Sequence, residues 1–272
     1  MLQHEKMQEI LQKKAYDARD LVTIVEMLRA PGGCPWDREQ THRSIRNDFI
    51  EETYEVIEAI DKNDPALLRE ELGDVLLQIA MHAEMEKEAG RCTFDDIAND
   101  ICQKMIHRHP HVFGDVKAET SEQVLSNWEV IKSEEKKRES VTDKLNAIPR
   151  QFPALMRASK VGKKAAVMDF PDAESVCQKL EEELAEVREA MAEGDSAHIE
   201  EEIGDLLFTA ANLARKCKVN AEQALCAATD KFIARFAAVE QAVLAEGKEM
   251  AQLSMAELDE IWEKVKKNNE NC

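Results

Sequence analysis

The chain has 272 residues, enough for one or two domains and for a substantial buried core. Hydrophobic residues make up 44% of it and aromatic residues only 5%, which is typical of helices packed through aliphatic side chains. Its 36 basic and 55 acidic residues give a formal net charge of −19, which argues against non-specific nucleic-acid binding because a phosphate backbone would be repelled. We therefore expect an all-α protein. The negative charge does not exclude small phosphorylated ligands, because divalent cations held by carboxylates can bind phosphate, so the charge points to a metal.

The seven cysteines are scattered along the chain and never stand in C-x-x-C spacing. This distribution favours neither a disulfide framework nor a zinc site, and it suits a reducing cytoplasm. The first residues lack the apolar centre of a secretion signal, and no stretch approaches the roughly 18 uncharged apolar residues of a membrane span. We therefore expect a cytoplasmic protein that is neither secreted nor inserted in a membrane.

Helix ends are indicated at several positions along the chain. In chain order, the signals are an N-cap with a following proline at Asp64 and Pro65, a terminating Gly90, a terminating Gly194 with a new start at Asp195 and Ser196, and a capping box from Ser254 to Glu257. They predict roughly four helices in each half of the chain, joined by short turns.

An acidic pattern occurs twice, at a constant offset of 131 residues. The motif E-E-x-x-E at 51–55 is followed by E-E-x-x-D at 70–74, and the same two motifs return at 182–186 and 201–205. Each copy is followed by a Lys-x-x-x-Arg pair and a Trp-x-x-x-Lys pair: Lys104, Arg108, Trp128 and Lys132, then Lys231, Arg235, Trp262 and Lys266. Such self-similarity is typical of duplicated structural units. The sequence therefore predicts two copies of one helical module.

Two prolines, Pro149 and Pro153, interrupt the segment between the copies, where a helix cannot continue. We place the domain boundary there. The predicted organisation is an N-terminal module over residues 1–140, a linker over 141–153 and a C-terminal module over 154–272.

In the first copy, Glu52 and Glu55 project from one helix face, and Glu71 and Asp74 from one face of the next helix. The turn predicted at 64–65 makes these two helices an antiparallel hairpin, and Glu55 and Asp74 lie at nearly equal distances from it. An apolar stripe on the second helix should turn it toward a core; it comprises Leu68, Leu72, Val75, Leu76 and Ile79. We therefore expect the carboxylates to border a buried seam.

Four carboxylates in one small space require a compensating cation, since like charges in a partly desolvated site raise one another's pKa values. Oxygen ligands without cysteine or clustered histidine select Mg²⁺ or Mn²⁺. The lysine and arginine one helix later supply donors for phosphate oxygens. Metal, phosphate donors and a water nucleophile together describe metal-assisted hydrolysis of a phosphoanhydride.

Two other functions fit parts of the pattern. A single E-E-x-x-E is usually a solvated helix face, so one alternative is a non-catalytic helical dimer acting as a scaffold or regulatory partner. Such a dimer has no need for matching acidic pairs in both halves, and the absence of saturable Mg²⁺ or Mn²⁺ binding would favour it. A ferritin-like di-iron oxidase would need two Glu-x-x-His pairs, and only Glu39 with His42 fits.

With these motifs, the sequence resembles the MazG family of nucleoside triphosphate pyrophosphohydrolases over nearly the whole chain. The segment 28–42, LRAPGGCPWDREQTH, is similar to the family's N-terminal signature, and 107–114, HRHPHVFG, is similar to another family segment. The resemblance implies a tandem helical protein that forms homodimers. It further implies hydrolysis of NTPs and dNTPs to the monophosphate and pyrophosphate with Mg²⁺, in nucleotide-pool sanitation.

The resemblance also assigns residues in the second module. The implied metal ligands are Glu183, Glu186, Glu202 and Asp205, and Glu182 and Glu201 stand beside them as further catalytic carboxylates. The positions associated with nucleotide binding are Lys179, Lys231, Arg235, Trp262 and Lys266. In the first module the matching, second metal site is Glu52, Glu55, Glu71 and Asp74. One departure is His198, which stands where the family has a lysine before the E-E-E-x-G-D segment.

The two modules differ at one charged position. Lys179 has Asp48 as its counterpart at the offset of 131, so the first copy carries negative charge where the second carries positive charge. Exchanging attraction for repulsion toward a triphosphate weakens its binding. We therefore expect the second module to be the main catalytic one.

The remaining histidines and tryptophans carry less information. His107, His109 and His111 alternate across a proline and share no helix face, so they are expected at a helix end rather than in a metal site. Trp262 is a candidate for stacking on a nucleobase, whereas the other two tryptophans are expected in the core or at an interface.

Overall fold

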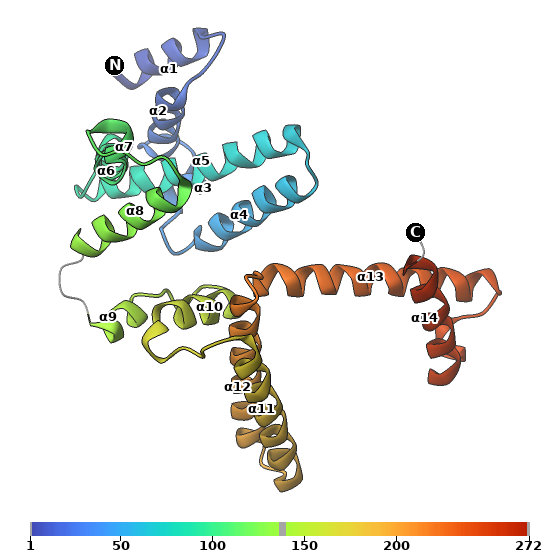
Figure 1. Cartoon of the computed structure of the whole chain (residues 1–272). Helices are drawn as coiled ribbons and strands as arrows, with labels where there is room; N and C mark the ends of the chain where they lie inside the picture. Colours follow the sequence, from blue (N-terminus) through green and yellow to red (C-terminus); the bar gives the residue numbers. More distant parts are fainter. Residues whose placement is uncertain (1, 136–139, 271–272) are drawn as a thin grey trace. The chain divides into compact units, whose positions relative to one another are not determined.

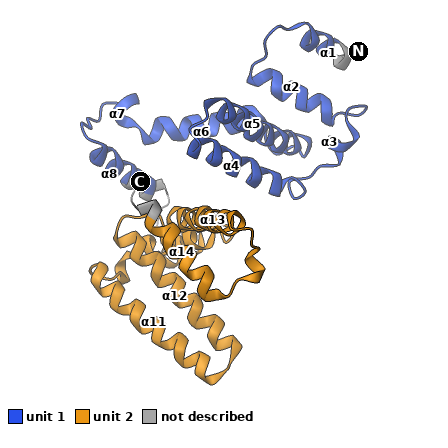
Figure 2. Ribbon diagram, turned by 90° about the vertical axis from the view of Figure 1, so that its right-hand side faces the viewer, with its two compact units in different colours: residues 1–135 blue, residues 136–272 orange. Residues whose placement is uncertain are grey.

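A computed structural model describes residues 2–135 and 140–270, and all regular elements in these ranges are helices (Figure 1). The predicted all-α class is confirmed. The chain divides into two compact units, residues 1–135 and residues 136–272 (Figure 2). The unit boundary precedes the predicted linker, which contains the short helix α9 (Val141–Asn146).

Unit 1 contains α1 (Leu2–Gln12), α2 (Ala18–Arg29), α3 (Pro35–Glu39), α4 (Arg46–Asp61), α5 (Pro65–Glu88), α6 (Phe94–Arg108), α7 (Pro110–Phe113) and α8 (Ser121–Glu135). Unit 2 contains α9, α10 (Ala154–Lys164), the 3₁₀ turn η1 (Ala166–Met168), α11 (Ala173–Glu193), α12 (Ser196–Lys216), α13 (Ala221–Ala245), the 3₁₀ turn η2 (Met250–Gln252) and α14 (Met255–Glu270). The expectation of roughly four helices per half was too low for both units. Prolines explain two of the extra helices, because Pro35 and Pro110 each begin a short one.

The predicted helix ends are confirmed where the hairpins turn. The Asp64 carboxylate accepts hydrogen bonds from the backbone N–H groups of Ala66 and Leu67, and α5 starts at the following proline. Gly194 ends α11 with a left-handed φ of 75°, a conformation that glycine adopts without strain, and Asp195 caps α12. The sequence thus determines two antiparallel hairpins, α4–α5 and α11–α12.

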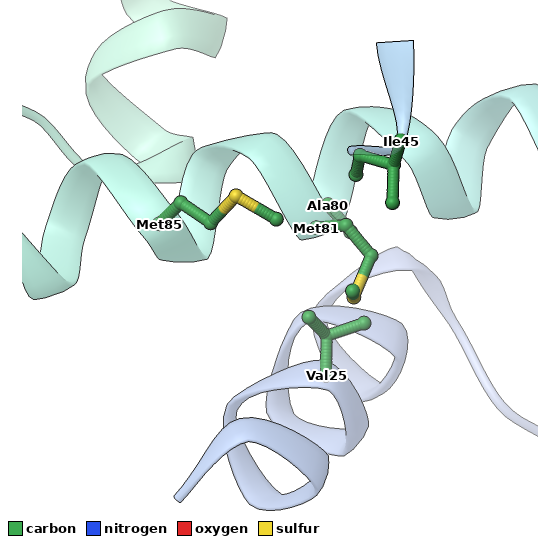
Figure 3. Packing of buried hydrophobic residues seen from close by; sticks show 5 residues of the cluster. All are labelled: Val25, Ile45, Ala80, Met81 and Met85. Carbon is green, nitrogen blue, oxygen red and sulfur yellow. The ribbon is translucent and has the colours of Figure 1, made fainter. Parts of the chain in front are cut away.

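The core of unit 1 lies where α2 crosses α5 (Figure 3). Its buried members are Val25, Ile45, Ala80, Met81 and Met85. The predicted apolar stripe lies earlier on α5 and is only partly buried, with Leu72 51% exposed. That prediction was wrong in its position, because α2 covers the later part of α5 that contains the core residues.

An arginine ties the N-terminal signature segment to α5. Arg29 is buried at the end of α2 and donates two hydrogen bonds to the Glu88 carboxylate, at 2.9 and 2.7 Å. It also donates to the backbone carbonyls of Asp37 and Gln40. One bidentate side chain therefore fixes α2, α3 and the end of α5 together.

A second arginine has a comparable role in unit 2. Arg215 on α12 binds the Asp169 carboxylate and also donates to Asn212 Oδ1, while Lys216 contributes an ion pair of 2.8 Å to Asp169. All of these side chains are at most one-fifth exposed. The network fastens the segment before α11 to α12.

The helices α13 and α14 form an arm, defined here as residues 221–270. Figure 1 shows α13 leading away from the α11–α12 hairpin, with α14 packed against α13. Much of its apolar surface faces solvent: Phe232 is 56% exposed and Ile233 is 59% exposed. Among the described residues, no helix is both long and apolar enough to cross a membrane.

Candidate functional site

Two clusters of three glutamates lie on the two hairpins. Cluster 1, in unit 1, is Glu52, Glu55 and Glu71; cluster 2, in unit 2, is Glu183, Glu186 and Glu202. Within each cluster, one carboxylate oxygen per residue lies within 4.8 Å of the others. Two of the three glutamates come from the first helix of the hairpin and one from the second. The duplicated motif therefore folds into the same arrangement twice.

Cluster 1 is partly shielded from water. Glu71 is 9% exposed, Glu52 is half-buried and Glu55 is exposed. Burial raises the pKa of Glu52, and the charges of Asp74 and Glu55 raise it further. Burial also raises the pKa of Glu71, with the charge of Glu55 as the next cause. Burial, and after it the charges of neighbouring carboxylates, therefore disfavours the ionised forms of Glu52 and Glu71.

Cluster 2 is built around a buried carboxylate with a lysine beside it. Glu183 is 5% exposed, and the Lys179 Nζ lies 3.1 Å from its Oε1. The same Nζ lies 2.7 Å from Glu182 Oε1 and 3.9 Å from Glu186 Oε2. Hydrogen bonds to Glu182 and Glu183 raise the pKa of Lys179, so it stays an ammonium. Burial raises the pKa of Glu186, opposed by the positive charge of Lys179.

The contact between Lys179 and the carboxylates was missed at the level of sequence, although a signal for it existed. The three glutamates stand three, four and seven residues after Lys179, which places all of them on its face of α11. The sequence predicted that Lys179 binds the nucleotide, but it did not predict that Lys179 also contacts the glutamates.

His198, the departure from the family pattern, contacts a predicted ligand. Its Nε2 lies 3.1 Å from Glu202 Oε1 and its Nδ1 lies 2.9 Å from Glu193 Oε2. The hydrogen bond with Glu193 is the main cause that raises the pKa of His198. A titratable side chain on α12 therefore contacts cluster 2, and its protonated form is favoured by the two glutamates.

The other predicted carboxylates lie near the clusters but outside them. Asp74 is half-buried and its charge reaches Glu52, whereas Asp205 is exposed. Glu182 and Glu201 are exposed, and Glu182 contacts the same Lys179 ammonium as Glu183. The structure thus brings three of the four predicted metal ligands of each module together.

The residues of both clusters fit a hard divalent cation. Each cluster offers three carboxylates from two rigid helices, without a cysteine or histidine among its members. Such an oxygen donor set is the kind that Mg²⁺ and Mn²⁺ prefer. Burial is the main cause that raises the pKa values of Glu52 and Glu186, and neighbouring carboxylates raise them further; a bound cation would offset both effects.

The other predicted nucleotide-binding residues lie on the arm. Lys231 and Arg235 belong to α13, and Trp262 and Lys266 belong to α14. The Trp262 and Phe232 rings pack with centroids 5.3 Å apart, which joins the two helices. Within the described part of the chain, α14 makes no extensive contact with α11 or α12. Among the described ion pairs, Lys179 is the predicted nucleotide-binding residue that contacts cluster 2.

Two of the matching basic residues of unit 1 lie over the ring of a tryptophan. The Arg108 guanidinium lies 5.3 Å and the Lys132 ammonium 4.5 Å from the centre of the Trp128 ring. Cations over an aromatic face are stabilised by the ring quadrupole. The Trp-x-x-x-Lys spacing, one helical turn, is the signal that predicts such a pair.

The histidines at 107–111 lie at a helix end, as the sequence predicted. His109 lies between α6 and α7, and its Nδ1 is 2.7 Å from the Met105 carbonyl oxygen, so the run 107–111 is a helix junction. His42 stacks on His82, with ring centres 5.0 Å apart, and its Nε2 lies 2.8 Å from Glu86 Oε1. Both contacts of His42 are therefore with residues of α5.

Comparisons with known proteins agree with the duplicated arrangement. The MazG nucleotide pyrophosphohydrolase domain matches residues 40–113 and again residues 172–239. The nucleoside triphosphate pyrophosphohydrolase of Escherichia coli (strain K12) is 45% identical over 254 residues, which cover 91% of this chain and 96% of that protein.

Two further relatives show the same likeness. The nucleoside triphosphate pyrophosphohydrolase/pyrophosphatase MazG of Thermotoga maritima is 43% identical over 253 residues, which are 92% of this chain and 96% of that protein. The nucleoside triphosphate pyrophosphohydrolase of Mycobacterium tuberculosis is 38% identical over 154 residues, 56% of this chain and 46% of that protein. Each domain match includes one hairpin with its glutamate cluster. The chain therefore belongs to the MazG nucleotide pyrophosphohydrolase family and carries two MazG domains in tandem.

Proposed function

We propose that this hydrolase cleaves nucleoside and deoxynucleoside triphosphates to the monophosphate and pyrophosphate, with Mg²⁺ held by its second module. The observation that carries the proposal is cluster 2, in which a carboxylate 5% exposed converges with two others from a neighbouring turn and a neighbouring helix. The relatives named above supply the substrate class and the bond that is cleaved.

Glu183, Glu186 and Glu202 would hold the cation. Asp205, three residues after Glu202 on the same face of α12, would be a fourth ligand. A divalent cation bound there would lower the pKa of a bound water molecule and stabilise the negative charge of the phosphate oxygens. Lys179 donates hydrogen bonds to the phosphates from the α11 side. Glu182 and Glu201, which directly precede Glu183 and Glu202 in the chain, are available to accept a proton from the attacking water.

We infer that the enzyme is a homodimer in which the arm of one copy lies over the α11–α12 hairpin of the other. Two features support this arrangement. The arm carries Lys231 and Arg235 beside exposed Phe232, and the hairpin carries the acidic cluster beside Leu207, which is 52% exposed. Charge and apolar surface are therefore complementary between arm and hairpin. The phosphate donors would then reach cluster 2 from the second copy.

The second module is proposed to carry most of the activity. Lys179 lies 3.1 Å from Glu183, whereas its counterpart Asp48 stands in the first turn of α4, where negative charge suits the helix dipole. A triphosphate approaching cluster 1 would meet this extra negative charge. Cluster 1 is proposed as a second cation site that supports the assembly or acts on another nucleotide.

Removal of unwanted nucleotides from the cellular pool is the role that we propose for this activity, and the cytoplasm stays the predicted location. The reaction itself is tested by phosphorus NMR of the products formed from a panel of NTPs and dNTPs with Mg²⁺, and again with excess EDTA. Monophosphate and pyrophosphate, formed only with the metal, are expected. Diphosphate and orthophosphate as main products would refute the assignment, and a protein without saturable Mn²⁺ binding or activity would favour the non-catalytic scaffold.

A further inference from the structure

The Lys179 ammonium and the candidate cation site use the same carboxylates. Its Nζ lies 3.1 Å from Glu183 Oε1 and 3.9 Å from Glu186 Oε2, and both glutamates belong to cluster 2. A third contact, 2.7 Å to Glu182 Oε1, holds the ammonium at the edge of the cluster. The lysine side chain is only 30% exposed, so its position is constrained by α11 itself.

A second cation among these carboxylates would repel the Lys179 ammonium and weaken its contacts with Glu183 and Glu186. The Glu183 side chain is 7% exposed, and a carboxylate so far from water needs a positive partner, which Lys179 provides. A divalent cation among the same oxygens would lie within a few ångströms of the ammonium. Positive charges at that separation repel strongly in a partly buried site. The ammonium and the divalent cation therefore cannot both contact the carboxylate oxygens of Glu183 and Glu186.

The first module provides the contrast within the same chain. Asp48 takes the place of Lys179 at the offset of 131, and α4 begins at Arg46, only two residues before it. The helix α11 begins six residues before Lys179, so the lysine stands inside the helix with its glutamates one and two turns ahead. Among the described ion pairs, none joins a lysine or arginine to Glu52, Glu55 or Glu71.

We propose that the Lys179 ammonium competes with the divalent cation for Glu183 and Glu186, so that metal binding releases Lys179 from these carboxylates and makes it available to substrate phosphates. Its availability to a phosphate rests on the proposed function, whereas the competition itself concerns the cation alone. The second module would then bind metal weakly by itself and strongly once a triphosphate accepts the lysine. Among the described residues, cluster 1 has no such lysine or arginine competitor, so it should bind its cation without a nucleotide.

The experiment measures Mn²⁺ binding without nucleotide, by calorimetry and by the electron paramagnetic resonance of free Mn²⁺. A background carrying Glu52→Gln and Glu55→Gln leaves cluster 2 as the glutamate cluster under study. In that background Lys179→Met should bind Mn²⁺ at least about tenfold more tightly than the parent, because the repulsion is removed. Lys179→Arg, which keeps the positive charge, should resemble the parent.

A matched control reverses the charge in the first module. In a background carrying Glu186→Gln and Glu202→Gln, Asp48→Lys should weaken Mn²⁺ binding at cluster 1. If Lys179→Met misfolds by circular dichroism, Lys179→Gln takes its place. Unchanged or weaker Mn²⁺ binding on loss of the lysine overturns the competition, as does a lack of Mn²⁺ binding in parent and variant alike. Absence of NTP hydrolysis with the expected Mn²⁺ affinities would instead count against the proposed function only.

Discussion

Gly162 lies against the side-chain amide of Asn212, so that a Cβ at position 162 would overlap Asn212 Oδ1 and come within 3.0 Å of Arg215 Nε. Both neighbours belong to the network that fastens the segment before α11. Gly162→Ala should therefore destabilise the protein by about 1–3 kcal/mol, the usual cost of overpacking. Urea denaturation measures this. Gly204→Ala is the control, because open space surrounds its Cβ position and alanine is the better helix former. Equal stabilities of the two variants would contradict the prediction.

The same network gives a pH dependence with a definite sign. Hydrogen bonds from Arg215 hold the pKa of Asp169 well below its usual range, and Lys216 adds to the effect. A carboxylate whose folded pKa is lowered stabilises the fold above its unfolded pKa, and this contribution is lost as the pH falls through the folded value. Asp169→Asn should thus cost about 2 kcal/mol at pH 7. In urea titrations, the difference in the free energy of unfolding between the variant and the parent should shrink as the pH falls below about 4. A difference that grows on acidification would contradict this assignment.

The division of labour between modules is tested by a matched pair of substitutions, Glu55→Gln and Glu186→Gln. Each removes one carboxylate from its cluster at equal side-chain volume. Glu186→Gln should lower kcat by at least about 100-fold, because a cation ligand is lost, whereas Glu55→Gln should leave most of the activity. Both variants are assayed on one NTP after their fold and oligomeric state are checked. The reverse result would move the working site to the first module.

The proposed exchange of arms predicts complementation between two inactive chains. In a heterodimer of Glu186→Gln with Arg235→Ala, one site would combine the intact hairpin of one copy with the intact arm of the other. About half of the parent activity is expected, although each homodimer is nearly inactive. The heterodimers are purified through two different tags and assayed for pyrophosphate release.

The reciprocal heterodimer provides the control. When one chain carries both substitutions and its partner carries none, an exchanged arm leaves each site with one defect, and activity should be nearly absent. If arms served their own hairpins, the two results would be interchanged. A monomer in light scattering at micromolar concentration would also exclude the exchange.

Local chemistry made the hairpins predictable from sequence. Asp64 and Gly194 act through neighbours in the chain, by capping a helix and by adopting a positive φ, so no distant contact is needed to recognise them. The convergence of Glu52, Glu55 and Glu71 followed from helical periodicity and from equal distances to the turn. The contact of Lys179 with Glu183 obeys the same periodicity and could have been derived.

Long-range packing could not be predicted in the same way. The periodicity of α5 locates an apolar stripe around Leu72, but α2 selects the later face around Met81 and leaves Leu72 half exposed. Likewise, the His42–His82 stack joins a loop to a helix 40 residues away, and no local spacing indicates it. The exposed apolar residues of α13, such as Phe232 and Ile233, indicate a surface suited to packing, but their spacing does not specify the partner.

The length of α13 has a consequence for how the enzyme is handled. It runs from Ala221 to Ala245, and its buried residues are Ala221, Val239 and Val243. A helix with so little of its surface packed gains most of its stability from whatever docks on it, and in the proposed dimer that docking obeys mass action. Dilution should therefore act on this protein as a mild denaturant, lowering its melting temperature and its specific activity together. Melting curves recorded over a hundredfold range of protein concentration would reveal this dependence.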